Sequence, residues 1–242
     1  SMRCMLIEDG NRLMLIDTGI GDKQSEKFFS YYFLFGDDTL KKSIESLGFG
    51  LDQITDVFLT HLHFDHCGGA IYRNSDGQFR PYFKNATYWS NENHWKWATE
   101  PNAREKASFL SENILPIQES GQLKFIDRTG DFTANAFSNI DVLFVDGHTE
   151  SQMIPHIQYK NQTIVFMADL LPSVGHIPLP YVMGYDTRPL LTLSEKDKFL
   201  TKAANEDYIL FLQHDFANEC CTLKHTEKGI RLDKTFNFND VI

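Results

Sequence analysis

The stretch "THLHFDHCGG", residues 60–69, places three histidines and one aspartate within six positions. A hydrophobic core has little use for such a cluster, because burying an unpaired polar group costs about 2–7 kcal/mol. Neutral imidazole and carboxylate are good ligands for zinc, at about 2.0–2.2 Å. The cluster of His61, His63, Asp65 and His66 therefore predicts a metal site.

One metal ion cannot easily use four ligands from so tight a turn, whereas two ions about 3.5–4 Å apart can share them. Three further candidate ligands each follow an apolar run: His148 after "VLFVDG", Asp169 after "VFMA" and His214 after "LFLQ". We assign His61, His63 and His148 to a first metal ion, and Asp65, His66 and His214 to a second. Asp169 would bridge the two ions, although an aspartate after a strand can also cap a helix. The other histidines, His94, His156, His176 and His225, have the default interpretation of ordinary core or surface residues.

Apolar runs and turn residues predict an alternation of strands and helices that hairpins interrupt. Hairpins are expected around Asp9-Gly10 and Lys228-Gly229, because such dipeptides favour tight turns. Helices are expected over 37–48 and over 90–114, the second broken at Pro101, and short buried strands over 56–60, 139–148, 163–170 and 207–215. This order favours mixed sheets with helices outside them, and not a purely parallel sheet. We see no linker or internal repeat and predict one domain over 1–242.

The composition excludes several classes of function. The formal net charge is −10 without a Lys/Arg cluster, so nucleic acid is an unexpected partner. No apolar run approaches the roughly 18–20 residues that span a bilayer, so we expect no membrane insertion. The four cysteines lack the CxxC spacing of a zinc ribbon or redox motif. No signal peptide is visible, so we expect a cytoplasmic location, although the abrupt apolar start suggests that a preceding strand is missing.

The motif THxHxDHxGG, followed in order by GHT, AD and a late His, resembles the metallo-β-lactamase superfamily of hydrolases. The segment "LIDTG" at 15–19 is similar to the early strand-turn motif of that family. The resemblance implies an α+β fold, a four-layer αββα sandwich of mixed sheets with helices on the outer faces. It also implies a binuclear site at one sheet edge, where Asp17 would steady the metal loop without binding metal.

The predicted chemistry is metal-assisted hydrolysis. A water bound to two divalent ions would supply hydroxide at neutral pH to attack a carbonyl or phosphoryl centre. Asp65 and Asp169 are the predicted catalytic residues, and Asp65 would help to move a proton to the leaving group. The His/Asp ligand set suits Zn²⁺, while Mn²⁺, Fe²⁺ and Co²⁺ accept similar ligands.

The middle of the chain resembles the branch of the family that holds quorum-quenching N-acyl homoserine lactonases and organophosphate hydrolases. An aromatic-rich helical insertion at about 90–118 would either cover the metal site and contact an acyl chain or pack onto the sheet. Small lactonases carry a tyrosine three residues after the bridging aspartate, where this chain has Pro172. Tyr181, Tyr185 or His176 could serve instead. The predicted pocket for a small-molecule substrate is lined by Trp95, Phe109, His176 and Tyr181.

Two other functions stay open beside a lactonase. A thioesterase similar to glyoxalase II or a phosphotriesterase would use the same metal ligands, although the 28 residues after His214 are too few for the C-terminal helical domain of glyoxalase II. A non-catalytic metal-binding or redox protein is a third candidate. Redox relatives typically carry a carboxylate in the first motif and an added flavin domain, so His63 and the short chain disfavour it. The sequence does not indicate an oligomeric state.

Overall fold

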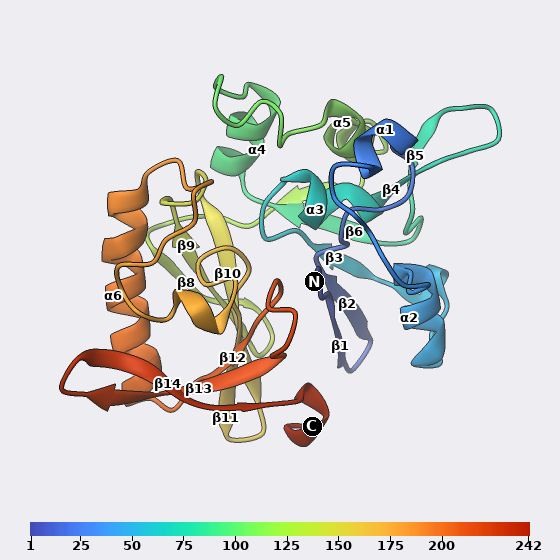
Figure 1. Ribbon diagram of the computed structural model, residues 1–242. Coiled ribbons are helices and arrows are strands. Elements are labelled where there is room, and N and C mark those ends of the chain that lie inside the picture. Colours follow the sequence, from blue (N-terminus) through green and yellow to red (C-terminus); the bar gives the residue numbers. More distant parts are fainter. The chain divides into compact units, whose positions relative to one another are not determined.

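The computed structural model describes residues 1–242, which form two compact units (Figure 1). The N-terminal unit is Met2–Ile126, and the C-terminal unit is Asp127–Ile242 together with Ser1. The expectation of a single domain with an insertion at about 90–118 stays a prediction.

The N-terminal unit contains a five-stranded sheet of order β1-β2-β3-β6-β7 and a separate β4-β5 hairpin. Strands β1 and β2 pair antiparallel around Asp9 and Gly10, which confirms the predicted hairpin, and the other neighbours in the larger sheet pair parallel. The elements are β1 (Met5–Asp9), β2 (Arg12–Ile16), α1 (Glu26–Phe29), α2 (Leu40–Ser46), η1 (Leu51–Gln53), β3 (Asp56–Phe58), α3 (Phe64–Cys67), η2 (Gly68–Ala70), β4 (Ile71–Arg73), β5 (Phe79–Pro81), β6 (Thr87–Ser90), α4 (Glu92–Thr99), α5 (Ser111–Glu119) and β7 (Leu123–Phe125).

The central strand β3 positions the histidine cluster. Val57 and Phe58 have no exposed surface, as expected for a short apolar strand buried on both faces. Because β2 and β3 run parallel, the residues that follow them meet at the same edge of the sheet. The backbone N–H of Asp17, directly after β2, donates to the Phe58 carbonyl over 2.9 Å. The segments "LIDTG" and "THLHFDH" thus lie side by side.

The helical prediction for 90–114 is only partly correct. Helix α4 begins after Asn91, whose side chain accepts a hydrogen bond from the His94 N–H, and it ends at Thr99, before Pro101. The chain then turns around Asn102, and the second helix, α5, begins at Ser111 and continues to Glu119. The α2 prediction is confirmed, with Thr39 as its N-cap.

The C-terminal unit contains a seven-stranded sheet of order β14-β13-β12-β11-β10-β9-β8, in which only β11 and β12 pair parallel. The predicted hairpin around Lys228-Gly229 is formed by β13 and β14. The elements are β8 (Phe132–Phe137), β9 (Ile140–Val145), β10 (Gln152–Tyr159), β11 (Gln162–Phe166), η3 (Val174–His176), α6 (Pro189–Asn205), β12 (Ile209–Phe211), β13 (Cys220–Thr226), β14 (Gly229–Phe236) and η4 (Phe238–Asp240).

Three strands of this sheet point in the same direction. Strand β10 is antiparallel to both β9 and β11, and β12 is parallel to β11, so β9, β11 and β12 end at the same edge. His148, Asp169 and His214 follow these three strands. The long helix α6 lies in the connection between β11 and β12, and its Phe199 packs against His156 of β10. Asp169 is not a helix cap, because no helix begins directly after it.

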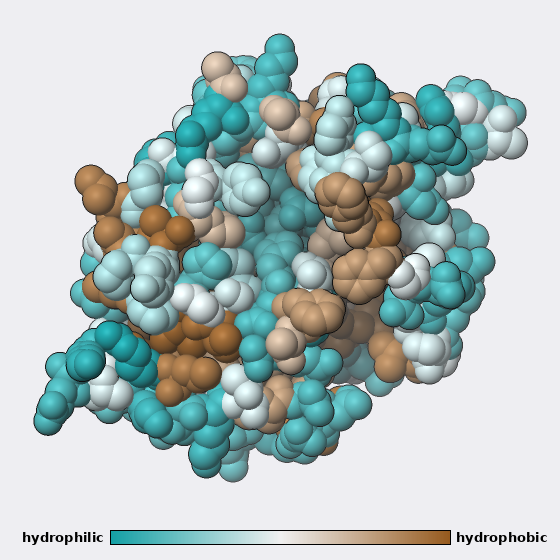
Figure 2. Space-filling model, viewed as in Figure 1, coloured by the Kyte–Doolittle hydropathy of each residue, from teal (hydrophilic) through white to brown (hydrophobic).

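The predicted mixed sheets with helices are confirmed. The helices are all too short or too polar to cross a membrane. The most exposed aromatic side chains of the N-terminal unit follow α1, where Phe33 and Phe35 are each 83% exposed. Figure 2 shows apolar side chains at the surface in this part of the molecule.

Candidate metal centre

Asp17 holds both ends of the histidine loop of the N-terminal unit. Its Oδ1 accepts a hydrogen bond from the Thr60 N–H, and its Oδ2 lies 2.8 Å from both the Thr60 hydroxyl and the His66 Nδ1. Asp17 is fully buried, with a φ of 55° that is rare for an aspartate. Asp17 thus connects the two ends of the loop by hydrogen bonds; that it is not itself a ligand stays a prediction.

The two glycines of the motif allow the loop to approach the "LIDTG" turn. A Cβ at Gly68 would collide with the backbone carbonyl of Ile20, and a Cβ at Gly69 with that of Thr18. The Gly68 carbonyl also accepts a hydrogen bond from the Lys23 ammonium group. Only glycine fits at these two positions.

The predicted ligands of the N-terminal unit lie close together. The ligand atoms of His61 and His63 are within 4.8 Å of each other, as are those of Asp65 and His66. The His61 ring lies 3.8 Å from the His66 ring and 4.6 Å from the His63 ring, measured between centroids. His61 and His66 are fully buried, His63 is 7% exposed, and Asp65 is half-buried.

Side chains from α4 and the segment after it support this loop. His94 Nε2 accepts a hydrogen bond from the Leu62 N–H, which confirms His94 as a buried, hydrogen-bonded residue. The His63 Nε2 lies 3.5 Å from Glu105 Oε1, and Glu105 accepts a hydrogen bond from the Trp97 indole. Both α4 and the turn around Glu105 therefore order the histidines.

In the C-terminal unit, Asp169 contacts two histidines with different oxygens. Its Oδ2 lies 3.1 Å from His148 Nε2, and its Oδ1 lies 2.9 Å from His214 Nε2. One carboxylate thus faces the ends of two strands at once. That Asp169 bridges two ions stays a prediction.

In three predicted ligand histidines, Nδ1 is used in a hydrogen bond, so Nε2 is the atom available to bind a metal ion. His66 Nδ1 faces Asp17, His148 Nδ1 lies 3.0 Å from Asp186, and His214 Nδ1 lies 2.8 Å from the Ser1 carbonyl. A carboxylate or carbonyl oxygen can only accept, so the Nδ1 atoms carry the protons. Metal-ligating histidines are oriented in this manner in proteins. The donor set therefore fits a divalent cation bound through imidazole and carboxylate.

Charges around His148 favour a cation at this point. Burial lowers the pKa of His148, but the carboxylates of Asp169 and Asp186 outweigh it and raise that pKa to about 9. The position thus attracts positive charge, which a proton or a metal ion can supply. Cys67, by contrast, has a pKa that burial raises to about 12, and its thiol donates to the Leu62 carbonyl. Cys67 is thus buried and hydrogen-bonded within the loop; that it does not bind metal stays a prediction.

The predicted substrate residues fall into two groups. Trp95 and Phe109 are each only 6% exposed and belong to the hydrophobic core of the N-terminal unit. Of the two roles that the sequence left open for the insertion, their burial favours packing onto the sheet. His176 is half-buried with its Nδ1 2.8 Å from the Ser173 hydroxyl, while Tyr181 is 60% exposed.

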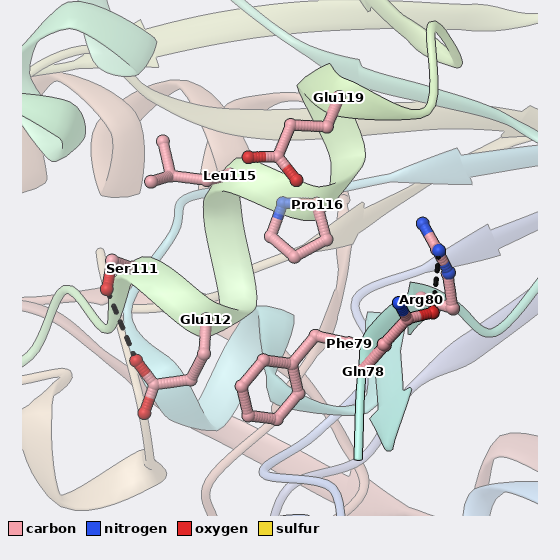
Figure 3. A pocket seen from close by; sticks show the side chains of 8 residues that line it. All are labelled: Gln78, Phe79, Arg80, Ser111, Glu112, Leu115, Pro116 and Glu119. Carbon is pink, nitrogen blue, oxygen red and sulfur yellow. Dashed lines mark hydrogen bonds between the residues drawn. The ribbon is translucent and has the colours of Figure 1, made fainter. Parts of the chain in front are cut away.

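A pocket in the N-terminal unit lies between the β4-β5 hairpin and α5 (Figure 3). Its lining includes the acidic residues Glu112 and Glu119 together with Arg80 and Phe79. Ser111 donates to Glu112, and Arg80 donates to Gln78. None of the predicted metal ligands lines this pocket, so it is separate from the candidate centre.

A family comparison agrees with the motifs and their order. Residues 3–214 match the model of the metallo-beta-lactamase superfamily, a range that includes all seven predicted ligands. The chain belongs to the metallo-beta-lactamase superfamily. Membership identifies it as a metal-dependent hydrolase of this fold.

Relatives within the superfamily are distant. An N-acyl homoserine lactonase from Bacillus thuringiensis is 23% identical over 231 residues, which cover 89% of this chain and 82% of the lactonase. A probable metal-dependent hydrolase from Staphylococcus aureus superposes with a TM-score of 0.81 at 22% identity, covering 98% of this chain and 83% of that chain. The dizinc quorum-quenching lactonase AidC, solved with a product, gives a TM-score of 0.74 at 22% identity, covering 97% and 80%. The α+β metallo-beta-lactamase fold is thereby confirmed.

Sequence reasoning missed the residues that support the histidines from a distance. Asp186 is 38 positions from His148, and Glu105 is 42 positions from His63. Neither lies in a motif, so only the fold connects them to the ligands. Phe64 was also missed, although it lies between two predicted ligands; its ring contacts Phe28 and Tyr32 at 5.4 and 5.0 Å.

Proposed function

We propose that this chain hydrolyses an ester-type bond, that of an N-acyl homoserine lactone or a similar lactone, with two bound divalent metal ions. The N-terminal unit would supply His61, His63, Asp65 and His66, and the C-terminal unit would supply His148, Asp169 and His214. The observation that carries the proposal is the carboxylate of Asp169, whose two oxygens face two different histidines. The match to the superfamily supports this proposal, because the matched residues 3–214 include both sets of predicted ligands.

Zinc is the proposed metal. The ligand set contains only imidazole and carboxylate, and the similar lactonase AidC is described as a dizinc enzyme. When bound, such ions polarise an ester carbonyl and make hydroxide available at neutral pH. The chain's own residues then have separate tasks. Asp169 would be a ligand of both ions, and the half-buried Asp65, 3.7 Å from His66, would accept a proton and pass it to the leaving oxygen.

An apolar surface beside the metal loop supports a substrate with an apolar part. Phe64 lies between His63 and Asp65 in the sequence, and its ring packs against Phe28 and Tyr32. Aromatic side chains of this kind provide contact area for an acyl chain. The proposed substrate is therefore a small molecule with a hydrolysable ester and an apolar chain.

Pro172 favours a second candidate. It stands where small lactonases carry a tyrosine that this chain lacks, and the proline side chain cannot donate a hydrogen bond to a developing oxyanion. A thioester or a phosphotriester is therefore the alternative substrate class. We propose the lactone first because its hydrolysis is the activity named for the curated relative.

The test is pH-stat hydrolysis by the zinc-loaded protein, with chelator-treated protein as the control. A short-chain and a long-chain N-acyl homoserine lactone are compared with a thioester and a phosphotriester. We expect acid release from both lactones, faster for the longer chain, because each buried CH₂ contributes about 0.8 kcal/mol. Turnover of the thioester or phosphotriester alone would reject the lactone assignment. Equal rates with and without chelator would reject metal dependence.

A further inference from the structure

Two adjacent residues of α6, Glu195 and Lys196, face the interior of the C-terminal unit. Lys196 is 1% exposed, although lysine is almost never fully buried unless it is paired. Glu195 is half-buried beside it. Each side chain binds a different backbone segment: one segment leads to the predicted ligand His148, and the other carries two predicted substrate residues.

The Lys196 ammonium group binds the backbone of residues 176–181. It donates to the carbonyl of His176 over 2.7 Å and to that of Tyr181, and the carbonyls of Pro178 and Leu179 lie 3.4 and 3.3 Å away. Four carbonyl groups of one short segment thus surround one cation. Residues 177–181 belong to no strand or helix, so Lys196 takes the place of a neighbouring strand as hydrogen-bond donor.

The segment that Lys196 holds includes two predicted substrate residues. The His176 ring faces the Ser173 hydroxyl, and Tyr181 is largely exposed. Val174, just before this segment, is bound to the loop after β12, because its N–H donates to Asp215, which follows His214. The His176 backbone is therefore fixed from one side by Lys196 and its ring from the other by Ser173.

The Glu195 carboxylate binds the turn that precedes His148. Its two oxygens accept hydrogen bonds from the Asp146 N–H over 2.7 Å and the Gly147 N–H over 3.0 Å. A Cβ at Gly147 would lie 2.5 Å from the backbone nitrogen of Thr192, so the turn is in close contact with α6. Because Glu195 accepts hydrogen bonds from both N–H groups, the turn that carries His148 is held in one orientation.

The charge of Asp186 acts on both His148 and Lys196. Its Oδ1 lies 3.0 Å from His148 Nδ1, and its charge raises the pKa of Lys196 against the effect of burial. Burial, the larger cause, lowers that pKa to about 8, so the ammonium form still predominates at neutral pH. The donor that the four carbonyls need is therefore present.

We infer that Glu195 and Lys196 are positioning residues, which use α6 as one rigid support for the His148 turn and for the segment 176–181. Glu195 acts on the turn before the predicted metal ligand His148, whereas Lys196 acts on two residues predicted to line the substrate pocket. The consequence for catalysis rests on the proposed function, but the effect on the two segments does not. Removing one group should loosen only its own segment.

The test uses Lys196→Met, which keeps the side-chain length and removes the donors, and Glu195→Gln. The matched controls are Lys198→Met and Asp197→Asn, which change exposed residues of the same helix. Amide hydrogen exchange of the metal-free full chain is measured by fragment. We expect Lys196→Met to increase exchange in 174–181, and Glu195→Gln in 146–148, each by at least about 10-fold, while the rest of the sheet is unchanged.

Activity and metal binding provide the second readout. Lys196→Met should raise KM for the hydrolysed substrate about 10-fold and leave the zinc affinity unchanged, because its segment holds no ligand. Glu195→Gln should weaken zinc binding about 10-fold, as partners of metal ligands do. The conservative variant Lys196→Arg, which keeps the cation, should restore both slow exchange and KM.

Three outcomes would overturn the inference. The first is unchanged exchange in 174–181 for Lys196→Met, and the second is a uniform increase over the whole chain, which indicates only lower stability. The third outcome applies if Lys196→Met does not fold: rapid exchange in 174–181 of Lys196→Arg would then overturn the inference. A wild-type protein that hydrolyses none of the substrates rejects the proposed function instead, and the exchange pattern still decides the role of the two residues.

Discussion

The two halves of the predicted ligand set, one in each unit, are held in place in opposite ways. In the N-terminal unit, four predicted ligands come from the six consecutive positions 61–66, and one aspartate, Asp17, holds the loop at both ends. In the C-terminal unit, three predicted ligands are spread over 148–214, and each follows a different strand. The first half depends on one turn, whereas the second depends on the common direction of β9, β11 and β12. A local half is visible in a short motif, and a distributed half exists only when the sheet is formed.

The largest effect is expected from Asp169→Asn, which tests whether the distributed half is needed for turnover. The amide keeps the shape of the side chain but is neutral, and it offers only one oxygen where the carboxylate faces His148 and His214 with two. Mutation of a residue that only hydrogen-bonds a metal ligand typically lowers metal affinity or activity about 10–100-fold. Loss of a shared ligand should therefore lower kcat by more than about 100-fold. The measurement is steady-state hydrolysis of the best substrate at saturating zinc.

Asp207→Asn is the matched control for this variant. Asp207 is exposed in the same unit and has a φ of 53°, a conformation that asparagine tolerates, so folding and turnover should not change. A kcat of Asp169→Asn within a factor of two of the wild type would show that the centre works without a bridging carboxylate.

The same contrast explains how far the sequence could predict the molecule. The motif 60–69, the strand β3 before it and the hairpin around Gly10 depend on neighbours within a few positions, and all were predicted. The family motifs also indicated His148, Asp169 and His214. What could not be predicted is the support of these residues, because the contacts of Asp186 and Glu195 join positions 38 to 49 apart. Such contacts exist only after β9 and α6 have packed.

The sequence also could not decide whether the aromatic residues of the insertion at about 90–118 are buried, because this too depends on contacts between distant segments. Helical spacing places Trp95 on one face of α4, but it cannot say whether that face meets a ligand or the core. The structure places Trp95 in the same hydrophobic core cluster as Ile114 and Ile117 of α5. The boundary of α5 was missed because Asn102 and Glu105 form a local turn that delays the second helix to Ser111.

A smaller effect should come from the aspartates that orient the histidines, Asp17 in one half and Asp186 in the other. In Asp17→Asn the amide nitrogen would face either the Thr60 N–H or the pair of donors at Oδ2, so at least one hydrogen bond is lost. In Asp186→Asn only the contact with His148 Nδ1 is at stake. We expect zinc affinity to fall about 100-fold for Asp17→Asn and about 10-fold for Asp186→Asn, measured by competition with a chelator.

The control is Asp76→Asn, which changes an exposed aspartate and should leave the zinc affinity unchanged. If Asp186→Asn loses as much affinity as Asp17→Asn, the local half is not more dependent on its aspartate than the distributed half. The contrast between one clamp and several scattered supports would then be wrong.

The smallest effect concerns two buried histidines of the C-terminal unit that titrate in opposite directions. Burial lowers the pKa of His148, but Asp169 and Asp186 outweigh it and raise the pKa to about 9. Burial, the larger cause, lowers the pKa of His156 to about 4, against a hydrogen bond to the Ile154 carbonyl. With an unfolded value near 6.5, His148 stabilises the metal-free protein below about pH 6.5 and loses this contribution as the pH rises towards 9. His156 contributes fully above about pH 6.5 and loses its contribution as the pH falls towards 4.

Urea unfolding of chelator-treated protein between pH 4.5 and 8 separates the two contributions. His148→Asn should reduce the loss of stability on the alkaline side, and His156→Phe should reduce the loss on the acid side, because phenylalanine fits among Phe132, Phe199 and Tyr208. The range ends at pH 8 because burial lowers the pKa of Lys23 and Lys196 to about 8, and their deprotonation adds stability above that pH. If His148→Asn left the alkaline slope unchanged, the carboxylates of Asp169 and Asp186 would not hold a proton there. The case that this position is built to attract a cation would then fail.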